Sequence, residues 1–171
     1  MGRDDKKSSW RAGSNHLKGM GKIKGSVITT VTAGYQFAPW LALEASGEFA
    51  LSERARGNQY RVGAKSTVWQ SAAKDDVLAL SADMLIGDAR FNQTYYGVTP
   101  QQSRRSGLAA YRADKGVYGY ALGANWTHQF SPAWSTNVAV TSTWLTDKVA
   151  DSQVVERRND TGATLAVLYS F

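Results

Sequence analysis

The feature that most limits how this chain can fold is an alternation, at every second position, of larger apolar residues with small or polar ones. It is clearest over 118–130, 134–145 and 161–171. Successive side chains of a β-strand point to opposite faces of a sheet, so this period is typical of strands that separate two different environments. No segment has a convincing helical pattern. With four less regular segments the sequence predicts seven strands, the further four being 23–37, 40–52, 60–71 and 77–90.

The length of these strands separates two kinds of all-β protein. Strands of soluble proteins usually have about 5–6 residues, whereas a tilted strand needs roughly 9–11 to cross a bilayer. The clearest segments here reach or exceed the second length. Trp134 and Trp144 lie on one face, and their separation projects to about 25 Å at a tilt of ~40°, the height of a lipid-facing band. The apolar face is therefore predicted to contact lipid.

The connections between the predicted strands alternate between short and long. Short periplasmic turns and long external loops are typical of bacterial outer-membrane barrels. The sequence therefore predicts an all-β fold, an antiparallel up-and-down transmembrane β-barrel in the outer membrane of a Gram-negative cell. We expect one barrel domain over 1–171, with a polar external segment over 1–22 and a long external loop over 91–116. The first 24 residues hold seven of the 20 basic residues and give the chain much of its net charge of +6.

Aromatic residues flank the predicted turns and end the chain. The expected girdle at the membrane interfaces consists of Phe37, Trp40, Phe130, Trp134 and Trp144. The C-terminal segment resembles the signal recognised by the barrel-assembly machinery, through Leu165, Val167, Tyr169 and Phe171.

An odd number of strands is unusual, because bacterial barrels normally have an even number with both ends in the periplasm. Two unpaired edges in lipid would leave backbone groups unsatisfied at several kcal/mol each. We therefore expect this chain to be the C-terminal part of a larger barrel, with further strands and an export signal upstream. The alternative is a complete chain in which one strand is miscounted.

The long loop carries a family resemblance. Its matching residues are Tyr95, Tyr96, Gly97, Val98, Thr99, Ser106, Gly107, Leu108 and Tyr111, followed by Gly116. Together with segment 151–156, where Gln153 replaces a proline, and with segment 2–5, this pattern resembles the MltA-interacting protein/OmpV (MipA/OmpV) family. The resemblance implies an outer-membrane barrel and a non-catalytic scaffold that links a murein-degrading lytic transglycosylase to a murein synthase. It carries no catalytic residues to this chain.

Five charged residues share the face that is predicted to line the interior: Glu44, Glu48, Arg61, Lys65 and Asp83. They could form an ion-pair lattice, line a polar pathway for solute, or include paired carboxylates for acid–base chemistry. Glu44 and Glu48 would lie about 13 Å apart along one strand. This exceeds the roughly 5–9.5 Å between the carboxyl groups of glycosidases, which argues against that activity.

Several other chemistries have little support. The chain has no cysteine and only two histidines, His16 and His128, so we expect no metal centre, no cofactor and no thiol chemistry. His128 falls on the predicted lipid face, which argues against a catalytic base. The aromatic residues belong to girdles and not to a basic groove, so nucleic acid is not an expected partner.

Two functions remain open from the sequence. One is the scaffold, and the other is a narrow pore or surface receptor for small solutes. The long loop could constrict the interior, or it could contact lipopolysaccharide phosphates through Arg104 and Arg105.

Overall fold

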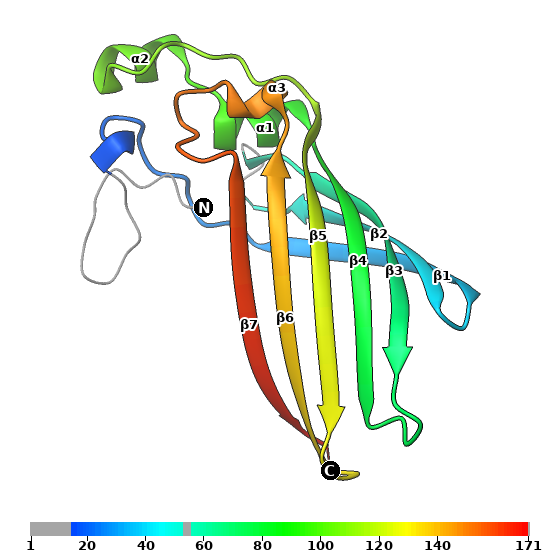
Figure 1. The fold of residues 1–171 in the computed structure, drawn as a ribbon. Helices are drawn as coiled ribbons and strands as arrows, with labels where there is room; N and C mark the ends of the chain where they lie inside the picture. The colour runs from blue at the N-terminus through cyan, green and yellow to red at the C-terminus, as the bar shows by residue number, and fades with distance from the viewer. Residues whose placement is uncertain (1–14, 53–55, 171) are drawn as a thin grey trace.

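Seven antiparallel strands form one curved sheet, in a computed structural model that describes residues 15–52 and 56–170 (Figure 1). Each strand pairs with the next along the chain, so the order is that of an up-and-down meander. The strands are β1 (Ile28–Ala38), β2 (Leu41–Ala50), β3 (Gln59–Gln70), β4 (Asp76–Gly87), β5 (Gly116–Gln129), β6 (Trp134–Leu145) and β7 (Asn159–Tyr169). All seven predicted strands are therefore confirmed. The clearest shift is in the first, which begins at Ile28 and not at Ile23.

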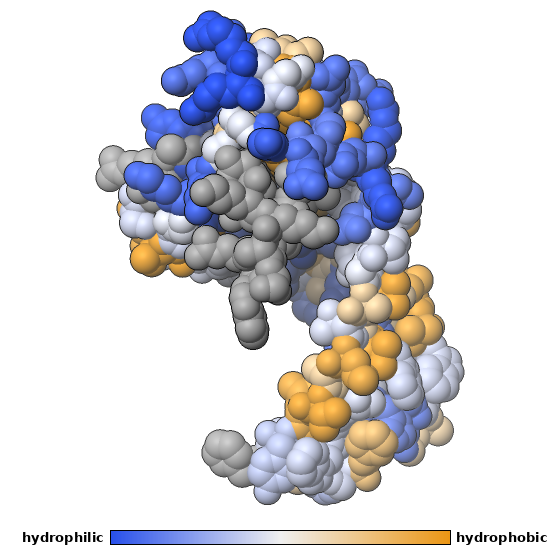
Figure 2. Space-filling view, turned by 90° about the vertical axis from the view of Figure 1, so that its left-hand side faces the viewer, coloured by the Kyte–Doolittle hydropathy of each residue, from blue (hydrophilic) through white to orange (hydrophobic). Residues whose placement is uncertain are grey.

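The two faces of the sheet differ in chemistry. On the inner face, the register places small and polar residues opposite one another, as in the row formed by Glu44, Gly63, Asp83 and Ala121. The outer face carries large apolar side chains that remain exposed; Leu165, for example, is 70% exposed. Figure 2, seen from the β7 edge, shows apolar side chains over a strand wall that curves around a hollow. The predicted alternation is thus present across the sheet.

Helices gather at one end of the sheet and form a cap, which we define as η1 (Asn15–Leu17), α1 (Ala89–Tyr96), α2 (Pro100–Ser106) and α3 (Asp147–Ala150) with their connecting segments (Figure 1). The opposite end carries the short turns between β1 and β2, β3 and β4, and β5 and β6, together with the end of β7. Within 15–52 and 56–170, no helix is long and apolar enough to cross a membrane.

The expectation that the chain has no helix is wrong, and local capping explains why. The carboxylate of Asp88 accepts a hydrogen bond from the backbone N–H of Phe91 at 2.7 Å, which starts α1 and ends β4 at Gly87. Strand 77–90 is therefore shorter than predicted. Thr99 and Gln102 form a reciprocal capping box, and Pro100 occupies the first position of α2. Both are recognised start signals that can define a helix too short for periodicity to reveal.

A β-bulge joins the cap to the sheet. Leu85 of β4 pairs with Gly119, but the next residue, Ile86, pairs with Val117, so Tyr118 is the extra residue in β5. Bulges often turn a side chain to the other face. Tyr118 is buried against α1 and α3 in a cluster with Leu85, Ala121 and Val149. The alternation predicted over 118–130 would place Tyr118 on the outer face with Tyr120, and for Tyr118 this is wrong.

The capping box gives a test of how α2 is held. We expect Thr99→Ala to destabilise α2 by about 1 kcal/mol, because the N-terminal amides of the helix lose a side-chain acceptor. Hydrogen exchange of the amides in 100–106 should accelerate roughly fivefold. Gln101→Ala, on the exposed side of the same helix, is the control. Equal exchange in the two variants would show that packing and not capping holds α2.

Candidate functional site at the capped end

The inner-face charges occupy three neighbouring strands. Glu44 lies opposite Gly63, which in turn lies opposite Asp83. Arg61 and Lys65 stand in the rows on either side of Gly63, so they are diagonal neighbours of both carboxylates. Gly63 has no side chain, and the Asp83 carboxylate fills the space that a Cβ would occupy there. Among the described residues, no nitrogen–oxygen distance of 4.0 Å or less joins these charges to one another.

Glu48 is part of a hydrogen-bonded chain just below the cap. The side-chain nitrogen of Gln59 donates to a Glu48 carboxylate oxygen at 2.5 Å. The Tyr118 hydroxyl donates to the side-chain oxygen of Gln59 at 3.0 Å. A cavity of about 160 Å³ beside them is also lined by Arg61 and Leu85. Sequence reasoning missed Gln59 and Tyr118. Gln59 pairs with Glu48 in the register, but Tyr118 reaches this position only through the bulge.

Aromatic rings close the inner face at the cap. The centroid of Phe91 lies 4.6 Å from that of Tyr95 and 5.3 Å from that of Tyr118, and Tyr96 lies 5.7 Å from Tyr118. Burial raises the pKa of Tyr96, so its hydroxyl stays protonated over the physiological pH range. The side chains of α1 and α3 thus form an apolar layer over this end of the sheet.

The loop motif residues hold the cap together. Val98 is 2% exposed and exchanges two backbone hydrogen bonds with Tyr111, at 2.7 and 2.9 Å. The Tyr111 hydroxyl donates to the carbonyl oxygen of Lys148 at 3.1 Å, which joins the loop to α3. Gly107 ends α2 with a left-handed backbone (φ 78°). Tyr95, Tyr96 and Gly97 end α1, whereas Ser106 and Leu108 flank Gly107.

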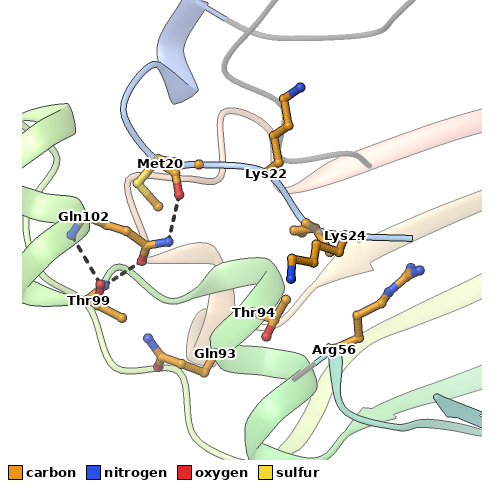
Figure 3. Close-up of a pocket in the computed structure, with 10 residues that line it drawn as sticks. Met20, Lys22, Lys24, Arg56, Gln93, Thr94, Thr99 and Gln102 are labelled. Carbon is orange, nitrogen blue, oxygen red and sulfur yellow. Dashed lines mark hydrogen bonds between the residues drawn. The ribbon is translucent and has the colours of Figure 1, made fainter. Parts of the chain in front are cut away.

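The cap holds a pocket of about 400 Å³, which we call the cap pocket (Figure 3). Its walls come from the segment 20–24, Arg56, α1 and the start of α2. Figure 3 shows Lys24 turned toward Thr94, Lys22 extended outward, and Arg56 on the opposite side. Its lining residues are Met20, Gly21, Lys22, Ile23, Lys24, Arg56, Gln93, Thr94, Thr99 and Gln102.

The uncapped end carries exposed aromatic residues beside its turns. Phe37, Trp40, Phe130 and Trp134 adjoin its turns, and all are exposed. The Trp126 indole donates to an Asp76 oxygen at 2.9 Å, and His128 Nδ1 lies 2.9 Å from the same oxygen. At the other end of the strands, Trp144 of β6 pairs with Tyr120 of β5.

The C-terminal strand and α2 carry the remaining predicted residues. Leu165, Val167 and Tyr169 are exposed on the outer face of β7, and Phe171 lies outside the described residues. Arg104 and Arg105 are exposed in α2. Over 15–52 and 56–170, no group of three or more histidine, aspartate or glutamate residues is arranged to hold a metal ion.

These features define a class of protein: a sequentially ordered antiparallel sheet of the up-and-down β-barrel type, apolar outside, polar inside and covered by helices at one end. The family follows from sequence comparison. The chain belongs to the family of the MltA-interacting protein MipA, whose model matches residues 2–171, and this confirms the resemblance noted above. Neither the curated proteins nor the solved structures contain a significant match.

Proposed function

We propose that this chain is part of an outer-membrane β-barrel that serves as a non-catalytic scaffold. Its partners would be a lytic transglycosylase of the MltA type and a murein synthase. The observation that carries the membrane assignment is the exposed apolar outer face of a sheet whose inner face is polar. A soluble barrel buries its large residues inside, whereas a bilayer requires them outside.

The outer face has aromatic residues near both ends. Phe130 and Trp134 adjoin the turn end, and Trp144 and Tyr120 lie together toward the cap. Strands of 10–14 residues span the distance between the two levels. Tryptophan and tyrosine prefer the level of the lipid headgroups. This arrangement supports a position across the outer membrane, with lipid around the sheet and lipopolysaccharide on the side of the cap.

The cap favours the scaffold over the pore. The side chains of Phe91, Tyr96 and Val149 pack on the inner face at one end, where a pore would need a water-filled opening. The inner charges then make the face beneath the cap polar, as diagonal neighbours that, within the described residues, do not form ion pairs with one another. The turns at the opposite end are short, so we place the binding of a periplasmic partner on the rim formed by these turns and their aromatic residues.

A binding experiment with two insertions tests this proposal. The full chain would be purified in detergent and immobilised, and a purified MltA-type transglycosylase titrated by surface plasmon resonance. A short epitope inserted in the turn 71–75 should weaken binding at least about tenfold, because it blocks the rim. The same epitope inserted after Gly107, in the cap, should have little effect.

Planar-bilayer recordings on the same preparation provide the second measurement. The scaffold predicts binding without conductance steps. Regular ion-conducting steps, together with no detectable transglycosylase binding, would instead support a narrow pore. Binding that the cap insertion abolishes and the turn insertion spares would contradict the orientation.

A further inference from the structure

We propose that a passage for small polar solutes crosses the cap beside α1, and that the contact between Arg56 and Tyr95 is the gate that closes it. The solutes are small molecules without net charge that carry hydrogen-bonding groups, such as zwitterions. The scaffold proposal requires no such passage, because its partner binds at the turn end, so either proposal can fail without the other.

Three hollows of the structure adjoin one another along this route. The cap pocket, of about 400 Å³, shares Arg56 with a small cavity of about 30 Å³. The small cavity shares Glu48 and Gln59 with the cavity of about 160 Å³ on the inner face. The shared lining residues therefore place the three hollows in order from the cap pocket to the polar inner face of the sheet.

The small cavity is the narrow point of the route. Its volume of about 30 Å³ is close to the share of liquid volume that one water molecule occupies. Helix α1 contributes Phe91 and Tyr95 to its walls, and the strands contribute Ile28 and Gln59. The route is therefore closed to solutes larger than water in this structure, in agreement with the aromatic layer over the inner face.

Arg56 lies between the cap pocket and the small cavity, because it lines both (Figure 3). Its guanidinium donates to the Tyr95 hydroxyl from Nε at 3.0 Å and from Nη2 at 2.5 Å, and lies 5.9 Å from the centre of that ring. The side chain of Arg56 is only half-buried, and rotamer changes of such side chains need no backbone movement. Rotation of this one side chain away from Tyr95 would join the two hollows.

The backbone around the gate is held in place. Gly57 has a φ of 72°, and a Cβ there would overlap the backbone nitrogen of Phe91, so only glycine fits. The backbone N–H of Asn58 donates to the Asp88 carboxylate at 2.9 Å, and the Asn58 carbonyl oxygen accepts from the Asp88 N–H at 3.0 Å. The segment before β3 is thus tied to the start of α1, and the opening keeps its frame when the arginine moves.

The charges along the route alternate in sign, which defines the class of solute. Arg56 lines the small cavity with Glu48, and Glu48 lines the inner cavity with Arg61. A cation would meet both arginines and an anion would meet the glutamate, whereas a molecule without net charge meets hydrogen-bonding groups throughout. Gln59 and Tyr118 add an amide and a hydroxyl to the inner cavity. Its volume of about 160 Å³ limits the solute to the size of a small amino acid.

Liposome swelling with two solutes of different size tests the passage. The full chain would be reconstituted in phosphatidylcholine vesicles, and swelling in glycine and in raffinose followed by light scattering. Arg56→Ala should raise the swelling rate in glycine at least about threefold, because it removes the side chain at the narrow point, and should leave the rate in raffinose unchanged. The control is Arg90→Ala, which removes the same side chain from an exposed position of α1 and should change neither rate.

Tyr95→Phe tests the hydrogen bond by itself. This variant keeps the ring and removes the hydroxyl to which Arg56 donates. We expect a swelling rate in glycine between those of the unchanged chain and of Arg56→Ala. A rate equal to that of the unchanged chain would overturn the assignment of the gate to this contact.

Three further results would overturn the proposal. The first is an equal glycine rate in Arg56→Ala and the unchanged chain, and the second is an equal rise in Arg90→Ala. The third is a rate in raffinose that is as high as that in glycine, in any of these proteins, because the cap would then not limit passage by size. Transglycosylase binding measured by surface plasmon resonance should be the same in all three variants, so a failure of the passage leaves the scaffold proposal standing.

Discussion

Val140→Arg should abolish assembly of this protein into membranes. Val140 lies in the middle of β6 on the outer face, between Ala124 and Ala163 on the neighbouring strands. An arginine facing lipid at mid-membrane depth costs about 2–4 kcal/mol in a barrel. The measurement is the fraction of protein that migrates as a folded, heat-modifiable species after refolding into vesicles. We expect this fraction to fall at least about tenfold.

The adjacent residue provides a matched control. Thr141 points to the inner face, where its neighbours across the sheet are Gly123 and Gly162. These glycines leave room for a long side chain, and a cation there meets a polar interior. Thr141→Arg should therefore assemble normally. Equal defects in the two variants, or a defect only in Thr141→Arg, would contradict the assignment of the faces.

Val149→Asp should release the cap while leaving the sheet folded. Val149 is 0% exposed and packs against Leu85 and Tyr118. An unpaired charge at such a position costs about 3–5 kcal/mol. We expect trypsin to cleave the loops 88–116 and 146–158 at least tenfold faster, with the strands still protected. If the cap closes the interior, the same variant should also conduct ions in planar bilayers.

Lys148→Asp tests whether charge alone has this effect. Lys148 is the preceding residue of α3, and its side chain is exposed. This variant introduces the same aspartate into the same helix without burying it. Because it removes a trypsin site from 146–158, the comparison is made in the loop 88–116, where cleavage should stay close to that of the unchanged chain. Equal release in both variants would show that the buried contact of Val149 does not hold the cap.

The strands were predictable because their pattern is strong and repeated. In β6 the predicted and observed bounds are identical, Trp134–Leu145, since large apolar residues recur at even-numbered positions (Trp134, Val138, Val140 and Trp144) and mostly small or polar residues lie between them. Antiparallel neighbours joined by short turns then fix the sheet order. The inner-face positions of the charged residues in β2 and β3 likewise follow from the two-residue period of a strand. Because a period of two defines both faces at once, one correct position assigns all the others in that strand.

The cap was less predictable because it depends on single contacts and not on a repeat. Asp88 and Thr99 are ordinary residues in sequence, and only their hydrogen bonds to the backbone make them helix starts. The bulge at Tyr118 leaves no trace in the alternation, which continues past it. The cap pocket brings together residues as distant as Lys22 and Gln102. This proximity depends on how the segments pack in three dimensions, and the spacing of the residues along the sequence does not reveal it.

The extra residue at Tyr118 has a consequence for how this protein can change over evolution. A strand with uninterrupted pairing tolerates exchanges of one side chain for another of similar kind. Removing one residue from 116–119 would instead restore regular pairing, send the tyrosine ring outward and leave Phe91 and Val149 without their partner. The packing of the cap on the inner face and the pairing frame of β5 are therefore inherited together, and length variation in this segment should be far rarer than substitution.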